Sequence, residues 1–124
     1  MPESLLVREI LGQMLDAIAK IERRFARIGN GNDFVSSDEG IDRLDGICMM
    51  LIALGDSCKN LDKITEGNLL AAYPAVDWKG IKGIRDVISH QYFDLDSDAV
   101  FGVCKKHIPF LRMTIETMLH DMEA

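Results

Sequence analysis

The chain has 124 residues, of which 48% are hydrophobic and 27% are charged, and its formal net charge is −6. This length predicts a single domain over residues 1–124, and the composition is typical of a soluble globular protein. An acidic chain is unsuited to holding nucleic acid over its whole surface, although it can still carry a local basic groove. No apolar run reaches the ~18–20 residues of a membrane span and the N-terminus lacks the basic segment of a signal peptide, so we expect a cytoplasmic protein without a membrane partner.

The first helix is predicted by an apolar stripe. From Val7 to Ile28, apolar residues recur at spacings of three and four, which places them on one face of a helix. Ser4 is a suitable N-cap, and the run from Gly29 to Asp33 contains the residues that end helices and form turns. We therefore expect a helix over residues 4–28.

A second helix is predicted to begin at Ser36, which has the capping-box spacing with Glu39. Apolar residues then follow at helical intervals over residues 41–61. Gly46 and Gly55 lie inside this helix, where each costs about 1 kcal/mol of helix propensity relative to Ala. Close approach of a neighbouring helix would offset this cost, and we expect such an approach here.

The remaining chain predicts further helices. Residues 62–76 break the pattern and leave room for a short helix at 66–72, after which Asp77 can cap a third long helix. Aspartates at 94–98 form the next break. The last helix carries an apolar stripe that includes His107 and Phe110, and Pro109 lies inside this helix, where proline causes a kink or a junction. No β-alternation persists, so the predicted fold is all-α: an antiparallel bundle of four to five helices with a kinked last helix.

The three cysteines, Cys48, Cys58 and Cys104, include no Cys-x-x-Cys pair. An odd number without paired spacing argues against a disulfide framework. Cys104 and His107 are three residues apart, but no second ligand pair follows to complete a zinc site. We therefore expect free thiols in the core and no metal site.

The segment from Asp77 to Asp96 carries the candidate functional residues. Arg85 falls in the apolar arc of its helix, between the directions of Trp78 and Tyr92. A guanidinium in that position needs an anionic or aromatic partner. Stacking of Arg85 on Trp78 or Tyr92 is the purely structural explanation.

Asp86 and His90 are one helical turn apart, so the Asp86 carboxylate can orient the His90 imidazole. An ordinary surface pair has the same spacing and is the structural alternative. Arg85 and His90 point about 140° apart on an ideal helix and lie about 7.5 Å apart along it. One straight helix therefore cannot readily aim both at one group: either the helix distorts near His90, or two copies of the chain combine their residues.

Arg85, His90 and Tyr92 form the pattern Arg-x4-His-x-Tyr. This pattern and four further segments resemble the HEPN domain family, and within it the small toxin branch called HepT. The further segments are Leu54–Leu61, Asp77-Trp78 with its approach to the arginine, Tyr92–Asp96, and His107–Leu111. They cover nearly the whole chain in the order of the family, so we expect a single HEPN-like helical domain.

The resemblance implies a metal-independent RNA endonuclease without a cofactor, acting on transfer or messenger RNA and not on DNA. His90 would transfer protons and Arg85 would hold phosphate, roles that suit imidazole and guanidinium groups, and Asp86 would support them. HEPN proteins are homodimers with a composite cleft, which agrees with the second geometric option above. Lys79 and Lys82 would extend a basic groove for RNA.

The resemblance also implies a regulatory partner. In similar systems a nucleotidyltransferase antitoxin of the MntA type adds AMP to the tyrosine of the motif, here Tyr92, and silences the toxin. Bulk and negative charge beside Arg85 would block the phosphate site. The alternative is a non-catalytic HEPN module that binds nucleotide or forms a complex with a nucleotidyltransferase, and the acidic composition favours it.

Overall fold

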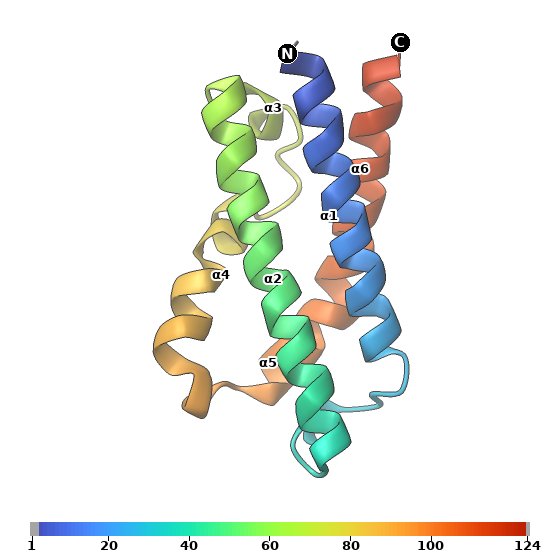
Figure 1. Ribbon diagram of the computed structural model, residues 1–124, viewed down its shortest axis with the longest axis vertical. Helices are drawn as coiled ribbons and strands as arrows, with labels where there is room; N and C mark the ends of the chain where they lie inside the picture. Colours follow the sequence, from blue (N-terminus) through green and yellow to red (C-terminus); the bar gives the residue numbers. More distant parts are fainter. Residues whose placement is uncertain (1–2, 124) are drawn as a thin grey trace.

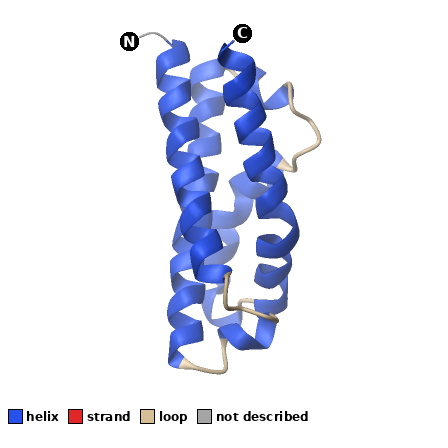
Figure 2. Cartoon of the chain, turned by 90° about the vertical axis from the view of Figure 1, so that its right-hand side faces the viewer, coloured by secondary structure: helices blue, strands red, loops and turns tan. Residues whose placement is uncertain are grey.

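The computed structural model describes residues 3–123, so residues 1–2 and 124 of the expected domain lie outside the described part. Its helices are α1 (Glu3–Phe25), α2 (Asp38–Thr65), α3 (Asn68–Ala71), α4 (Trp78–Gln91), α5 (Ser97–Gly102) and α6 (Ile108–Glu123). Two 3₁₀ turns, η1 (Gly31–Phe34) and η2 (Tyr92–Asp94), and a π-helical segment, η3 (Val103–His107), join them. The long helices alternate in direction along the chain (Figure 1, Figure 2), which confirms the predicted all-α bundle.

The core lies where α1 packs against α2 and α6, and α4 covers part of α2 at the edge of the bundle (Figure 1). The apolar stripe of α1 faces this core as predicted, although the helix contains Ser4 and ends at Phe25 instead of Ile28. Fully buried side chains from the three core helices include Leu11, Ile18, Ile47, Leu54 and Ile115. Within residues 3–123 no helix is long and apolar enough to cross a membrane.

The start of α2 lies one residue later than the capping box predicts. Ser37 is the N-cap, and its hydroxyl oxygen accepts a hydrogen bond from the backbone N–H of Gly40 at 3.0 Å. Ser36 belongs instead to the preceding turn, because its N–H donates to the carbonyl oxygen of Asn32 at 3.0 Å. Only Ser36 has the capping-box spacing with Glu39, but its N–H is used by the η1 turn, and the cap therefore forms at Ser37.

Both glycines inside α2 lie at close contacts, as predicted. A Cβ atom on Gly55 would be 2.7 Å from the carbonyl oxygen of Ile81 on α4. A Cβ atom on Gly46 would be 2.8 Å from the side chain of Arg24, which donates from Nη1 to the carbonyl oxygen of Gly46 at 3.0 Å. Gly55 therefore lies where the backbones of α2 and α4 are in close contact, and Gly46 lies where a side chain of α1 covers α2.

The last long helix is interrupted beside Pro109. Proline has no N–H to donate and its ring collides with the carbonyl group one turn earlier, so a regular α-turn cannot form there. The chain widens into η3, in which the N–H of Ile108 donates to the carbonyl oxygen of Val103. The wider turn also rotates the residues that follow: Ile108 is 3% exposed, whereas Phe110, which we expected on the buried stripe, is 39% exposed.

Candidate functional site

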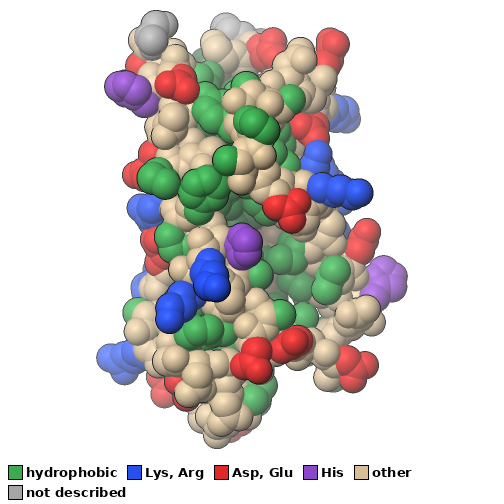
Figure 3. Space-filling view, turned by 180° about the vertical axis from the view of Figure 1, so that it is seen from behind, with side chains coloured by type: hydrophobic (Ala, Val, Ile, Leu, Met, Phe, Trp, Pro, Cys, Tyr) green, Lys and Arg blue, Asp and Glu red, His purple; other side chains and the backbone are tan. Residues whose placement is uncertain are grey.

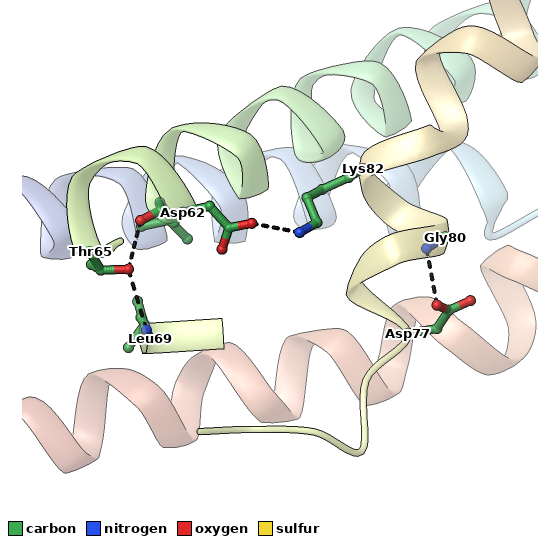
Figure 4. Close-up of polar contacts among 7 residues, drawn as sticks. Asp62, Thr65, Leu69, Asp77, Gly80 and Lys82 are labelled. Carbon is green, nitrogen blue, oxygen red and sulfur yellow. Dashed lines mark hydrogen bonds and ion pairs between the residues drawn. The ribbon is translucent and has the colours of Figure 1, made fainter. Parts of the chain in front are cut away.

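The helix α4 carries the candidate residues, and its first turn is fixed by two polar contacts. Asp77 is the N-cap as predicted, and its Oδ1 accepts from the backbone N–H of Gly80 at 3.0 Å (Figure 4). The buried Trp78 donates from its indole N–H to the carbonyl oxygen of Tyr73 at 2.9 Å. The start of α4 is thus anchored both to its own cap and to the loop before it.

Arg85 has the anionic partner that its place in the apolar arc required. Its Nη1 donates to Oδ2 of Asp56 on α2 at 2.9 Å. The two side chains are 54% and 40% exposed, so the ion pair lies at the surface of the seam between the helices. The contact recorded for Arg85 is therefore ionic, and not the stacking on Trp78 or Tyr92 that was the structural alternative.

Tyr92, in η2 directly after α4, also contacts α2. Its hydroxyl donates a short hydrogen bond to Oδ1 of Asp45. This hydrogen bond, with smaller contributions from desolvation, from the negative charge of Asp45 and from Cys48 once it ionises at high pH, raises the pKa of Tyr92 to about 12. The phenol therefore stays protonated at neutral pH. The ring of Tyr92 meets the edge of Phe93 at a centroid distance of 5.6 Å, and Phe93 is 98% exposed.

The two predicted RNA-binding lysines lie in different surroundings. Lys82 donates from Nζ to Oδ2 of Asp62 on α2 at 2.5 Å (Figure 4), so its charge is directed at a carboxylate. Lys79 is exposed on the outer face of α4. Asp45, Asp56 and Asp62 together form what we call the α2 carboxylate row, because each accepts a hydrogen bond from a polar side chain of α4 or η2.

His90 is exposed, and its contact with Asp86 differs from the one predicted. Nδ1 of His90 lies 2.9 Å from the backbone carbonyl oxygen of Asp86, not from the Asp86 carboxylate. Because a carbonyl oxygen can only accept, this contact assigns the proton to Nδ1 in the neutral ring. The helix backbone thus orients the imidazole and leaves Nε2 directed to solvent.

Arg85 and His90 remain on different sides of α4. The helix is regular through His90, and the backbone departs from helical geometry at Gln91, where φ is −131° and ψ is 23°. The distortion comes one residue too late to turn His90 toward Arg85. A single copy of the chain therefore does not bring these two side chains together. Of the two geometric options, only a site shared between two copies of the chain remains.

An apolar hollow of about 280 Å³ lies on another side of α4, between this helix and η3–α6. It is lined mainly by Val76, Ile81, Ile84, Val103 and Phe110. Figure 3 shows hydrophobic side chains gathered on this back face beside Lys, Arg, Asp, Glu and His side chains. His107, which we expected on an apolar stripe, is exposed at the rim of the hollow. The candidate residues Arg85, Asp86 and His90 do not line it.

The cysteines are buried free thiols, as predicted. Burial is the main cause that raises the pKa of Cys48 to about 11 and the pKa values of Cys58 and Cys104 to about 12. Such thiols are protonated and poor nucleophiles at neutral pH. Among residues 3–123, no group of three or more His, Cys, Asp or Glu side chains is arranged to hold a metal ion.

The α2 carboxylate row was not predicted from the sequence. One signal was available: Asp45 and Asp56 are eleven residues apart, about three turns, and so share a face of α2. Arg85 and Tyr92 are seven residues apart, about two turns, and share a face of their own segment. Only the packing of α4 on α2 reveals that the two faces meet.

Comparison with known proteins relates the chain to one protein family. The chain matches the protein family described as ribonuclease HepT-like over residues 14–118. Two proteins of Methanocaldococcus jannaschii named as candidate RNases are 30% and 29% identical over 73 and 74 residues, which is 59% and 60% of this chain and 60% and 58% of the relatives. A third protein of that organism, named as a gamma-glutamylcyclotransferase and candidate RNase, is 25% identical over 94% of this chain and 49% of its own length. The matches thus span less than two thirds of each of these relatives, and no solved structure matches the chain significantly.

Proposed function

The chain belongs to the HepT-like ribonuclease family, and we propose that it is an endoribonuclease that cleaves RNA without a metal ion. The observation that carries the proposal is the accessibility of Arg85 and His90. Arg85 is 54% exposed and commits one of its guanidinium donors to Asp56. His90 is exposed, with Nδ1 occupied by its own helix. Both side chains are available to a phosphodiester.

The proposed reaction uses the 2′-hydroxyl of RNA as the nucleophile. Nε2 of His90 removes the hydroxyl proton while the 2′ oxygen bonds to phosphorus. Arg85 donates to the non-bridging oxygens and stabilises the negative charge that develops on them. The 5′ oxygen leaves with the electrons of its bond to phosphorus and takes a proton from water, and the remaining hydroxide takes the proton from Nε2 of His90. The products are a 2′,3′-cyclic phosphate and a 5′-hydroxyl, and Asp86 supports the reaction by orienting His90 through its carbonyl oxygen.

The proposed active unit is a homodimer with a composite cleft. Arg85 points toward α2 and His90 points to solvent, so each copy presents half of the required pair. In a two-fold dimer, Arg85 of one copy can lie beside His90 of the other, and the symmetry creates this arrangement twice. A substitution that separates the copies should therefore abolish cleavage even though both residues are intact.

The RNA path that we propose runs over the outer face of α4. Lys79 is exposed and can contact phosphate, whereas the charge of Lys82 is partly neutralised by Asp62 at 2.5 Å. We therefore assign the larger contribution to Lys79 and a smaller one to Lys82. With a net charge of −6, the chain must concentrate its attraction for RNA at this face. Transfer RNA and messenger RNA are both suitable substrates.

We further propose that the protein is a cytoplasmic toxin silenced by AMP addition at Tyr92, carried out by a cognate nucleotidyltransferase of the MntA type. The Tyr92 side chain is 38% exposed, so a partner enzyme can reach the hydroxyl. Modification transfers AMP from ATP to the phenol oxygen in place of its proton, releases pyrophosphate, and ends the hydrogen bond to Asp45. The new negative charge then lies close to a carboxylate and two helical turns from Arg85, which would displace η2 and compete for the arginine.

The second candidate function is a non-catalytic module that binds nucleotide or a nucleotidyltransferase. The observation that favours it is the contact between Arg85 and Asp56, which already gives the arginine an anionic partner. In that case Arg85, His90 and Tyr92 would stabilise the fold or bind a partner, and the protein would cleave no RNA.

RNA cleavage in the presence of EDTA decides between the two functions. The variants are Arg85→Ala and His90→Ala, with Arg112→Ala and His120→Ala as controls that remove the same residue types from α6. A ribonuclease cleaves in EDTA, loses activity in the first two variants and keeps it in the controls. A folded wild type that cuts no RNA, or equal activity in all variants, contradicts the proposal.

A further inference from the structure

Asp56 occupies a rigid place on α2. It follows Gly55, where the backbone of α4 comes so close that a Cβ atom would lie 2.7 Å from the carbonyl oxygen of Ile81. Leu54 and Cys58, on either side of it in the sequence, are fully buried in the core. The Asp56 carboxylate is therefore held at a fixed position beside the contact between the two helices, while half of the side chain faces solvent.

The ion pair between Arg85 and Asp56 leaves part of the guanidinium group able to bind a second anion. In the described part of the chain, Arg85 donates one hydrogen bond to Asp56, from Nη1. Arg112 differs, because it donates from both Nε and Nη2 to the two carboxylate oxygens of Glu22. Both donors of the Nε–Nη2 edge of Arg112 are thus occupied by Glu22. The equivalent edge of Arg85, formed by Nε and Nη2, is open to a second anion.

The ion pair between Arg85 and Asp56 adds too little to the stability of the fold to explain why the two residues are there. Ion pairs between exposed side chains contribute little to folding stability, and both partners here are about half exposed. A long arginine side chain, in contrast, loses much rotamer entropy when it is ordered. A carboxylate that orders Arg85 beforehand removes part of that loss from the chemical step, in which the guanidinium must be in place.

We propose that Asp56 is the positioning residue of Arg85: it fixes the guanidinium through Nη1 and presents the Nε–Nη2 edge to the scissile phosphate. This inference rests on the proposed ribonuclease function and adds a residue on α2 to the site on α4. Asp56 does not touch substrate in this scheme. Its negative charge repels RNA slightly, while its orienting contact makes the arginine effective in the transition state.

These two effects have opposite signs in steady-state kinetics. Asp56→Ala removes the repulsion, so KM for an RNA oligonucleotide should stay equal or fall. The same change releases Arg85, so kcat should fall by roughly 10-fold or more, because small misplacements of catalytic groups are costly. Asp56→Glu keeps the charged acceptor and should restore kcat to within about 3-fold of wild type, since the arginine side chain can adjust to one added methylene.

The experiment measures kcat, KM and the melting temperature of wild type, Asp56→Ala, Asp56→Glu, Arg85→Ala and the double variant Arg85→Ala/Asp56→Ala. Glu22→Ala is the matched control, because it breaks a half-exposed arginine–carboxylate pair between α1 and α6. We expect Asp56→Ala to lower kcat in the presence of Arg85 and to have no further effect in its absence. Glu22→Ala should leave kcat unchanged.

Three outcomes overturn the inference. A wild-type or higher kcat in Asp56→Ala shows that the carboxylate is neutral or competes with RNA for Arg85. An equal fall of kcat in the presence and absence of Arg85 shows that Asp56 acts through the fold. Each of these leaves the ribonuclease function intact if wild type cleaves RNA and Arg85→Ala keeps only a small residual rate. Failure of the wild type to cleave overturns the proposed function as well as the inference.

Discussion

Gly55 on α2 lies directly against the carbonyl oxygen of Ile81 on α4: an added Cβ atom would be 2.7 Å from that oxygen. No real Cβ atom tolerates such a contact with backbone, so glycine is what allows α4 to pack this closely on α2. The polar contacts of Lys82, Arg85 and Tyr92 with the α2 carboxylate row depend on the same packing. One small residue thus sets the position of the helix that carries the candidate site.

Alanine at this glycine should destabilise the protein. Gly55→Ala gains about 1 kcal/mol of helix propensity but introduces a backbone collision, and overpacking costs about 1–3 kcal/mol. Gly12→Ala is the matched control, because Gly12 lies in α1 with nothing within 4 Å of the added atom. In thermal unfolding we expect a lower melting temperature for Gly55→Ala and a rise of about 3–5 °C for Gly12→Ala. A rise in both variants would mean that α2 and α4 do not touch at Gly55.

The tyrosines should titrate above their ordinary range. Hydrogen bonds to carboxylates are the main cause that raises the pKa of Tyr92 to about 12 and that of Tyr73 to about 12, with Asp45 and Asp121 as acceptors. Because the folded pKa is raised, the stabilisation is fully present below the ordinary tyrosine pKa of about 10 and is lost as pH rises through 12.

The ultraviolet absorbance of tyrosinate measures this titration. In Asp45→Asn, one of the two tyrosines should ionise at a lower pH than in wild type, because the acceptor loses its charge. Asp121→Asn should shift the other tyrosine in the same direction. An unchanged titration in Asp45→Asn would show that Tyr92 does not donate to Asp45 in solution.

Tyr92→Phe should separate cleavage from silencing. The variant keeps Arg85, His90 and the aromatic ring, so it should cut RNA at a rate close to that of wild type. Without the hydroxyl it cannot accept AMP, so incubation with the cognate nucleotidyltransferase and ATP should leave its mass and its activity unchanged. Tyr73→Phe is the control and should still be modified and silenced. AMP addition to Tyr92→Phe, found by mass spectrometry, would refute the assignment of the modified residue.

The thiols should be inert in the folded protein. Burial raises the pKa of all three cysteines to about 11 or 12, and each lies in the core. A thiol-specific reagent should therefore react slowly with the native protein and rapidly with all three thiols in denaturant. Fast modification of any thiol under native conditions would contradict the burial of that cysteine.

Local rules predicted much of the fold. The cap at Asp77, the close approach at Gly55 and the break near Pro109 follow from the chemistry of single residues, and the structure confirms each. The exposure of Phe110 was missed because it depends on a π turn, whose rotation a regular helical period does not contain. The capping-box rule selected Ser36, and the structure moves the cap to Ser37 because the preceding turn uses the N–H of Ser36.

The candidate site was less predictable because its contacts are long-range. The sequence indicates that Arg85 needs a partner, but not that the partner is Asp56, 29 residues away on another helix. The pairing of Tyr92 with Asp45 likewise depends on how α4 packs. For His90, the spacing pointed to the Asp86 side chain, whereas the backbone carbonyl one turn earlier provides the contact.

A mixing experiment tests the central claim, that one active site takes Arg85 from one copy and His90 from the other. Arg85→Ala and His90→Ala should each cleave RNA far more slowly than wild type, and mixing them in equal amounts with exchange of subunits should yield heterodimers in half of the molecules. Each heterodimer holds one intact site, so the mixture should recover about a quarter of the wild-type RNA cleavage rate. A mixture that forms heterodimers and stays inactive would contradict the composite site.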